Sequence, residues 1–123
     1  MSDIIYLTLE DLLDLAEMLG AEVRDPGLLD SSAFRPQSGM FGQDAYPTIW
    51  LKAAALMQSI DHNQALLDGN KRLSWIASLV FLHLNGHRIE ADIDSAYRLC
   101  MAVAAVESLE KIAEMLQRWA APT

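Results

Sequence analysis

A short polar segment holds the residue types in this chain that are most suited to chemistry. It consists of Asp68, Gly69, Asn70, Lys71 and Arg72. It begins the most hydrophobic helix that the sequence predicts, from about residue 70 to 85. The first turn of a helix has unpaired N–H groups and a partial positive charge, which disfavours cations there by roughly 0.3–1 kcal/mol. A bound anion would reverse this penalty, so Lys71 and Arg72 at this end of a helix indicate a phosphate site.

Each side chain of the segment has a candidate role and an ordinary structural alternative. Asp68 offers a hard oxygen ligand suited to the Mg²⁺ that accompanies a nucleotide, and Asn70 can donate to a phosphate oxygen. Alternatively, Asp68 is a helix cap while Lys71 and Arg72 extend into solvent, because Asp-Gly-Asn is also common in turns. The residues alone leave both interpretations open.

Composition limits the classes of partner. The chain has 123 residues, of which 52% are apolar, so we expect one domain spanning residues 1–123. Its 9 Lys and Arg against 17 Asp and Glu give a net charge of −8, which argues against nucleic-acid or anionic-membrane binding. Cys100 is the only cysteine and excludes a disulfide within the chain. No signal peptide or membrane-spanning run is recognisable, so we expect a cytoplasmic protein.

The rest of the sequence predicts an all-α fold that positions this segment. Predicted helices run from Thr8 to Gly20, from Asp25 to a stop before Pro36, from Thr48 to about His62, from about Asn70 to Asn85, from Asp92 or Asp94 to about Ala105, and from Leu109 to Trp119. The fourth helix is apolar nearly all round and is therefore expected to be the central, buried one. The stretch between residues 35 and 47 predicts a loop or a weak hairpin.

Several of these segments together resemble the Fic/Doc superfamily. The similarity consists of residues 68–72 and the helix ending Phe81-Leu82-His83-Leu84-Asn85-Gly86-His87, with further matches at 6–12, 35–37 and 41–47. It covers the chain from about residue 6 to 89 and is closest to the death-on-curing (Doc) toxin branch of type II toxin–antitoxin modules. The resemblance implies a compact six-helix bundle around a central buried helix, with a short β-hairpin flap at about residues 41–46.

The resemblance also implies a function. Doc toxins are kinase-like phosphotransferases that use ATP and Mg²⁺ to phosphorylate a threonine of elongation factor Tu, which stops translation. They are neutralised by a Phd-type antitoxin. Matched to the family motif, Asp68 would hold the metal, and Asn70, Lys71 and Arg72 would bind phosphates together with backbone N–H groups of Gly69 and Asn70. Fic enzymes that transfer AMP have glycine at the position of Lys71, so the bulky ammonium favours transfer of the γ-phosphate.

The chain departs from the family motif at Gln64, which occupies the position of the catalytic histidine. A glutamine amide cannot accept the hydroxyl proton, and losing a general base costs typically ~10²–10⁴-fold in rate. We therefore expect an attenuated or inactive form, whether Gln64 is natural or an engineered His→Gln change. His62 lies two residues away, about 200° around a helix, and is expected to point elsewhere. An AMP-transferring Fic enzyme and a non-catalytic, antitoxin-binding homologue are the alternatives.

Overall fold

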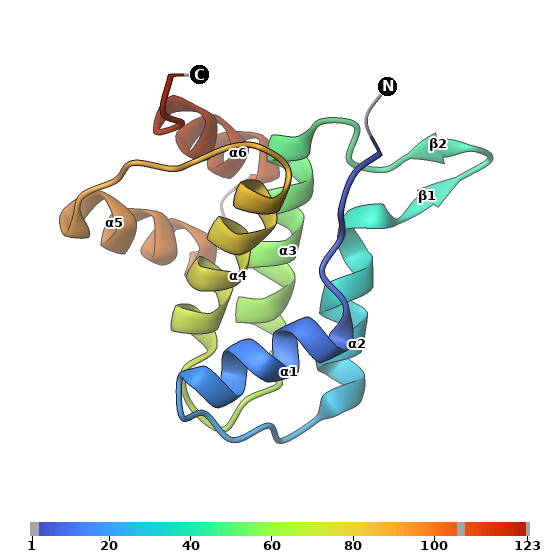
Figure 1. The fold of residues 1–123 in the computed structure, drawn as a ribbon, viewed down its shortest axis with the longest axis vertical. Coiled ribbons are helices and arrows are strands. Elements are labelled where there is room, and N and C mark those ends of the chain that lie inside the picture. Colours follow the sequence, from blue (N-terminus) through green and yellow to red (C-terminus); the bar gives the residue numbers. More distant parts are fainter. Residues whose placement is uncertain (1–2, 106–107, 123) are drawn as a thin grey trace.

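Helices dominate the computed structural model, which describes residues 3–105 and 108–122 (Figure 1). Within these residues there are six α-helices: α1 (Leu9–Met18), α2 (Pro26–Phe34), α3 (Ile49–Asn63), α4 (Asn70–Leu84), α5 (Ile93–Ala104) and α6 (Leu109–Arg118). A 3₁₀ helix, η1 (Arg35–Gln37), and an antiparallel hairpin of β1 (Gly39–Met40) and β2 (Gln43–Asp44) connect α2 to α3. The prediction of an all-α fold is confirmed, and the predicted loop or weak hairpin is a hairpin.

The central helix is α3. It packs against α2, η1, α4, α5 and α6, and it buries nine of its residues where the equally long α4 buries seven. The expectation that the helix beginning at Asn70 is the central one was therefore wrong. The reason is that the alanines at 53–55 let neighbours approach α3 closely from several sides, whereas Trp75 and Val80 on α4 stay only half-buried.

Side-chain caps define the start of most helices. In the part of the chain that the structure describes, five helices begin with an oxygen that accepts a backbone N–H of the first turn, from Thr8, Asp25, Thr48, Asp92 and Ser108. Within the same residues, α4 begins at Gly69 without any side-chain cap. The alternative in which Asp68 caps this helix is thus wrong, and the first N–H groups of α4 are left to solvent or a ligand.

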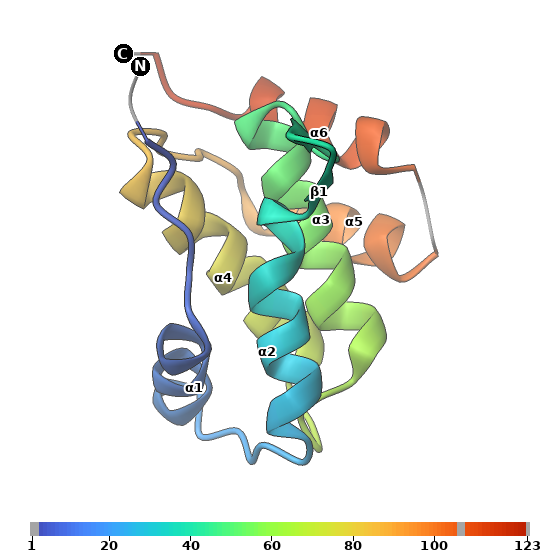
Figure 2. The ribbon, with the colours of Figure 1, turned by 90° about the vertical axis from the view of Figure 1, so that its right-hand side faces the viewer.

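The hairpin lies at the opposite end of α3 from the polar segment (Figures 1 and 2). The chain leaves β2 just before α3 begins, whereas the loop to α4 follows the end of α3. Since α3 has 15 residues, these ends are about 22 Å apart. The resemblance assigns residues 41–46 to the family's flap, which positions the target segment. The hairpin is present, but in this arrangement it lies at the other end of α3 from the motif.

Two contacts hold the hairpin and the segments that flank it. The ammonium of Lys52, which is almost fully buried, lies 3.2 Å from Asp44 Oδ2 and donates to the carbonyl of Pro36 at 3.3 Å. Arg35 Nε donates to the hydroxyl of Tyr46 at 2.9 Å, and its guanidinium also faces the Tyr46 ring.

Among the described residues, no helix is long and apolar enough to cross a membrane.

Candidate functional site

The polar segment forms a small pocket where α3 ends and α4 begins. The pocket has a volume of about 260 Å³ and is lined by Gln64 and residues 67–72. A larger hollow of about 470 Å³ lies between α3 and α6, but its lining residues include Glu110 and Glu114 and no Lys or Arg. The smaller pocket is therefore the better candidate for an anion, and it contains every site residue that the sequence predicted.

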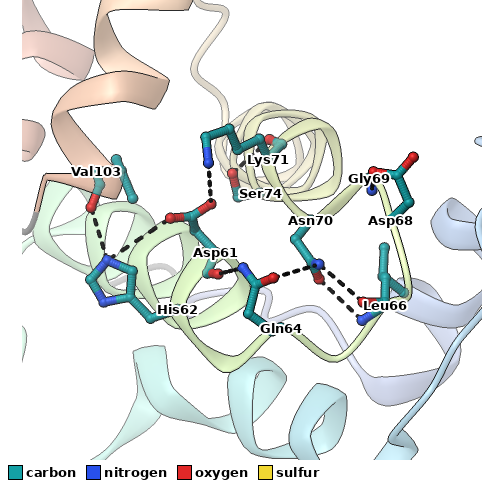
Figure 3. Close-up of polar contacts among 10 residues, drawn as sticks. All are labelled: Asp61, His62, Gln64, Leu66, Asp68, Gly69, Asn70, Lys71, Ser74 and Val103. Atoms are coloured by element: carbon teal, nitrogen blue, oxygen red, sulfur yellow. Dashed lines mark hydrogen bonds and ion pairs between the residues drawn. The ribbon is translucent and has the colours of Figure 1, made fainter.

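Gln64 ends α3 in a left-handed backbone conformation, with φ of +54°. Its side chain faces the motif (Figure 3): Nε2 donates to the carbonyl of Asp61, and Oε1 accepts from Asn70 Nδ2 at 3.3 Å. The guanidinium of Arg24 donates to the carbonyl of Gln64. These contacts hold a conformation that costs a residue other than glycine roughly 1–3 kcal/mol, and they turn the Gln64 side chain toward the pocket.

Asn70 closes the loop that precedes α4. Its buried amide donates to the carbonyl of Leu66 at 3.1 Å and accepts from the N–H of Leu66 at 3.0 Å. Both ends of the amide are therefore engaged in shaping the loop between residues 66 and 70. In this conformation Asn70 could bind a phosphate through its backbone N–H in the first turn of α4.

Asp68, Gly69 and Arg72 form the open side of the pocket. Asp68 is exposed, and its Oδ1 accepts from the N–H of Gly69 at 2.8 Å. Gly69 has φ of +93°, and a Cβ added there would lie 3.2 Å from Nη2 of Arg72. The Arg72 guanidinium therefore lies over Gly69, beside the uncapped start of α4. This places one cation and several unpaired N–H groups in the same small space.

Lys71 and His62 point to the other side of α4, toward α5 (Figure 3). The ammonium of Lys71 lies 3.8 Å from Asp61 Oδ1, and His62 Nε2 lies 2.9 Å from the carbonyl of Val103. The expectation that His62 points away from Gln64 is confirmed. Lys71 belongs to the pocket lining, but its charge is directed away from Asp68 and Gly69.

Sequence reasoning missed Asp61, a carboxylate buried beside this pocket. Its side chain is 5% exposed, and within the described residues its Oδ1 has no hydrogen-bond partner. Burial and then the Asp61 charge raise the pKa of the nearby Cys100 thiol, while Lys71 acts in the opposite direction. A charged residue next to the apolar positions 56, 57 and 60 of one helix was the available signal.

Metal binding by protein side chains alone has little support here. In residues 3–105 and 108–122, no three His, Cys, Asp or Glu side chains come together in a group that could hold a metal ion. The exposed carboxylate of Asp68 is instead suited to Mg²⁺ that takes its other ligands from phosphates and water.

The chain belongs to the Fic/Doc family, because the Fic/DOC family profile matches residues 6–82, which include the whole pocket. The resemblance found from the sequence is thereby confirmed. Among characterised relatives, the protein named Toxin Doc of Mycolicibacterium smegmatis (strain ATCC 700084 / mc(2)155) is 48% identical over 122 residues. That match covers 94% of each chain, so the protein described here is a homologue of a Doc toxin along nearly its whole length.

Proposed function

We propose that this protein is a Doc-type toxin that transfers the γ-phosphate of ATP to a threonine hydroxyl of elongation factor Tu and so inhibits translation. The observation that carries the proposal is the uncapped start of α4 with the Arg72 guanidinium over Gly69. The five other α-helices of the described residues satisfy this position with an Asp, Ser or Thr oxygen, and here an anion would take that place. We further propose a Phd-type antitoxin as its partner, on the strength of the relative's name.

The pocket fits a nucleotide phosphate chain. The backbone N–H groups of residues 70–72 and the Arg72 guanidinium would hold phosphate oxygens, and the absence of a Cβ at Gly69 leaves room for them. Asp68 would be the protein ligand of Mg²⁺, since Mg²⁺ is usually bound through one or two carboxylates together with substrate phosphates. When bound, the metal would neutralise charge on those phosphates.

Transfer needs a place for the hydroxyl proton, and Gln64 does not supply one. In the proposed reaction the threonine oxygen bonds to the γ-phosphorus, the bond to the bridging oxygen breaks, and ADP leaves. The Gln64 amide is already bonded to Asn70 and to the Asp61 carbonyl, and it cannot accept a proton near pH 7. The proton must therefore go to solvent, so positioning would persist while transfer is slowed.

Transfer of AMP is the second candidate, because the position of Lys71 weakens the argument against it. The bulk of Lys71 was the argument against AMP transfer, yet its ammonium lies beside Asp61 rather than over the Asp68–Gly69 turn. A third possibility, a homologue that binds an antitoxin without catalysis, is supported by Gln64 alone.

The experiment compares the unaltered protein with Gln64→His, using elongation factor Tu and either γ-labelled or α-labelled ATP. We expect γ-label on the factor, with Gln64→His faster by roughly 10²–10⁴-fold. Equal rates for the two proteins would contradict the assignment of position 64. Label from α-labelled ATP would favour AMP transfer, and no label from either protein would favour the non-catalytic homologue. As a matched control, His62→Gln in the Gln64→His background should leave the rate unchanged, because His62 faces α5.

A further inference from the structure

Asp61 is a buried carboxylate whose surroundings do not satisfy it. Within the described residues its Oδ1 has no hydrogen-bond partner; the Lys71 ammonium lies 3.8 Å from Oδ1, and the imidazole Nε2 of His62 lies 3.9 Å from Oδ2. A buried carboxylate without hydrogen bonds is unfavourable and therefore attracts any cation that can reach it. Lys71 can reach it, because its side chain is 52% exposed and long enough to adopt several directions.

Asp61 and the anion pocket lie on different sides of the start of α4 (Figure 3). Asp61 and the Lys71 ammonium face α5, whereas Asp68 and Gly69 lie across the first turn, with the Arg72 guanidinium over Gly69. Of the two adjacent cations in the motif, the structure thus places Arg72 at the pocket and Lys71 on Asp61. Consecutive residues of a helix point about 100° apart, so Lys71 and Arg72 extend from different sides of the first turn of α4.

We propose that Asp61 is a positioning residue that holds the Lys71 ammonium away from the anion pocket in the free protein. This inference rests on the proposed function, because it concerns a phosphate chain bound at the start of α4. A polyphosphate competes with the Asp61 carboxylate for Lys71. Asp61 thereby sets whether one or two cationic side chains meet the phosphates, and so determines the affinity of the site and the space left beside Gly69.

The test is a double-mutant cycle on ATP affinity, measured by calorimetry with Mg²⁺ present. Asp61→Asn keeps the shape of the side chain, removes its charge and frees Lys71, so we expect roughly tenfold tighter ATP binding. In the Lys71→Met background the same Asp61→Asn change should alter ATP affinity by less than about threefold, because no ammonium is released. Asp61→Glu should remain close to the unaltered protein, since the carboxylate is retained.

The cycle separates capture of Lys71 from simple repulsion. If Asp61→Asn tightens ATP binding equally with Lys or Met at position 71, Asp61 acts only as a distant negative charge and the inference is wrong. Unchanged affinity in Asp61→Asn also overturns it. Asp14→Asn is the matched control, because it removes one exposed carboxylate from α1 without contacting Lys71 and should change affinity by less than about twofold.

A measurement without nucleotide keeps the two proposals distinguishable. An ammonium held beside a buried carboxylate is less accessible to an acylating reagent. When lysine labelling is followed by mass spectrometry, Lys71 of the unaltered protein should therefore be acetylated more slowly than Lys71 of Asp61→Asn. Faster labelling of Lys71 in Asp61→Asn, with Lys111 unchanged, supports the pairing. If no variant binds ATP, the proposed function fails together with the role of Asp61 at the pocket, and the labelling then decides only whether Lys71 is paired. Equal labelling of Lys71 in both proteins contradicts the inference, whatever the result of the ATP-binding measurements.

Discussion

Replacing Gly69 by alanine tests whether the start of α4 holds phosphates. Gly69 has φ of +93°, a conformation that costs a residue with a Cβ about 1–2 kcal/mol. The new Cβ would also lie 3.2 Å from Nη2 of Arg72, closer than an ordinary van der Waals contact. Because the guanidinium ends a flexible side chain, it can move by a few tenths of an ångström at little cost in stability.

Gly86 provides a matched control at the other end of the same helix. It has φ of +90°, but a Cβ there would meet nothing within 4 Å. Gly69→Ala and Gly86→Ala should therefore lose similar folding free energy, about 1–2 kcal/mol, and the melting temperature should fall by about 3–6 °C for each kcal/mol. The two variants should differ in ligand binding, since only the first displaces Arg72.

The expected loss of ATP affinity follows from the contact that Arg72 would make. A hydrogen bond to a charged group contributes about 1.5–3 kcal/mol, and a displaced guanidinium keeps part of it, so Gly69→Ala should bind ATP about tenfold more weakly. Calorimetry at a temperature well below both melting transitions gives the affinity, and thermal unfolding gives the stability. Equal weakening by Gly86→Ala would assign the effect to stability. Unchanged affinity in Gly69→Ala would show that Arg72 does not meet the phosphates.

Two further predictions concern buried charges. Asp44→Asn should destabilise the protein by about 1–3 kcal/mol in urea unfolding, because Lys52 stays buried with a weaker partner. Lys52→Met should cost less stability, because it leaves no buried charge. The reverse order of the two variants would contradict the assigned contact. Asp61→Asn should lower the pKa of Cys100 and speed its alkylation by iodoacetamide at pH 8 roughly two- to fivefold, because Asp61 adds to burial in raising that pKa. The same comparison in denaturant should give equal rates, and equal rates in the folded proteins would show that Asp61 does not act on Cys100.

The parts of the fold that depend on local sequence could be predicted well. Thr8, Asp25 and Thr48 mark helix starts because each cap is a contact within three residues, and all three caps are present. The identity of the central helix depends on how many neighbours pack around it, which composition along one helix does not specify. For that reason the sequence predicted the more continuously apolar α4 as the central helix, whereas the central helix is the alanine-rich α3.

The candidate site shows the same division. Gln64 and residues 68–72 line one pocket because they are close together in the sequence and joined by a tight loop. Their grouping could therefore be predicted. The partner of Lys71 could not be predicted, since Asp61 reaches it from another helix. The separation of the hairpin from the motif does follow from the sequence, because the predicted helix from Thr48 to about His62 lies between them and is present as α3.

We expect substitution at Gln64 to change proton chemistry more than architecture. The loop is held by contacts that do not need an imidazole: Asn70 bonds to the backbone of Leu66, and Arg24 donates to the carbonyl of residue 64. Neither contact uses the side chain at position 64, so the first turn of α4 can present its N–H groups with either His or Gln there. Under the proposed function, binding of phosphates and transfer of phosphate would therefore be separable, and the protein would bind ATP while transferring its γ-phosphate slowly.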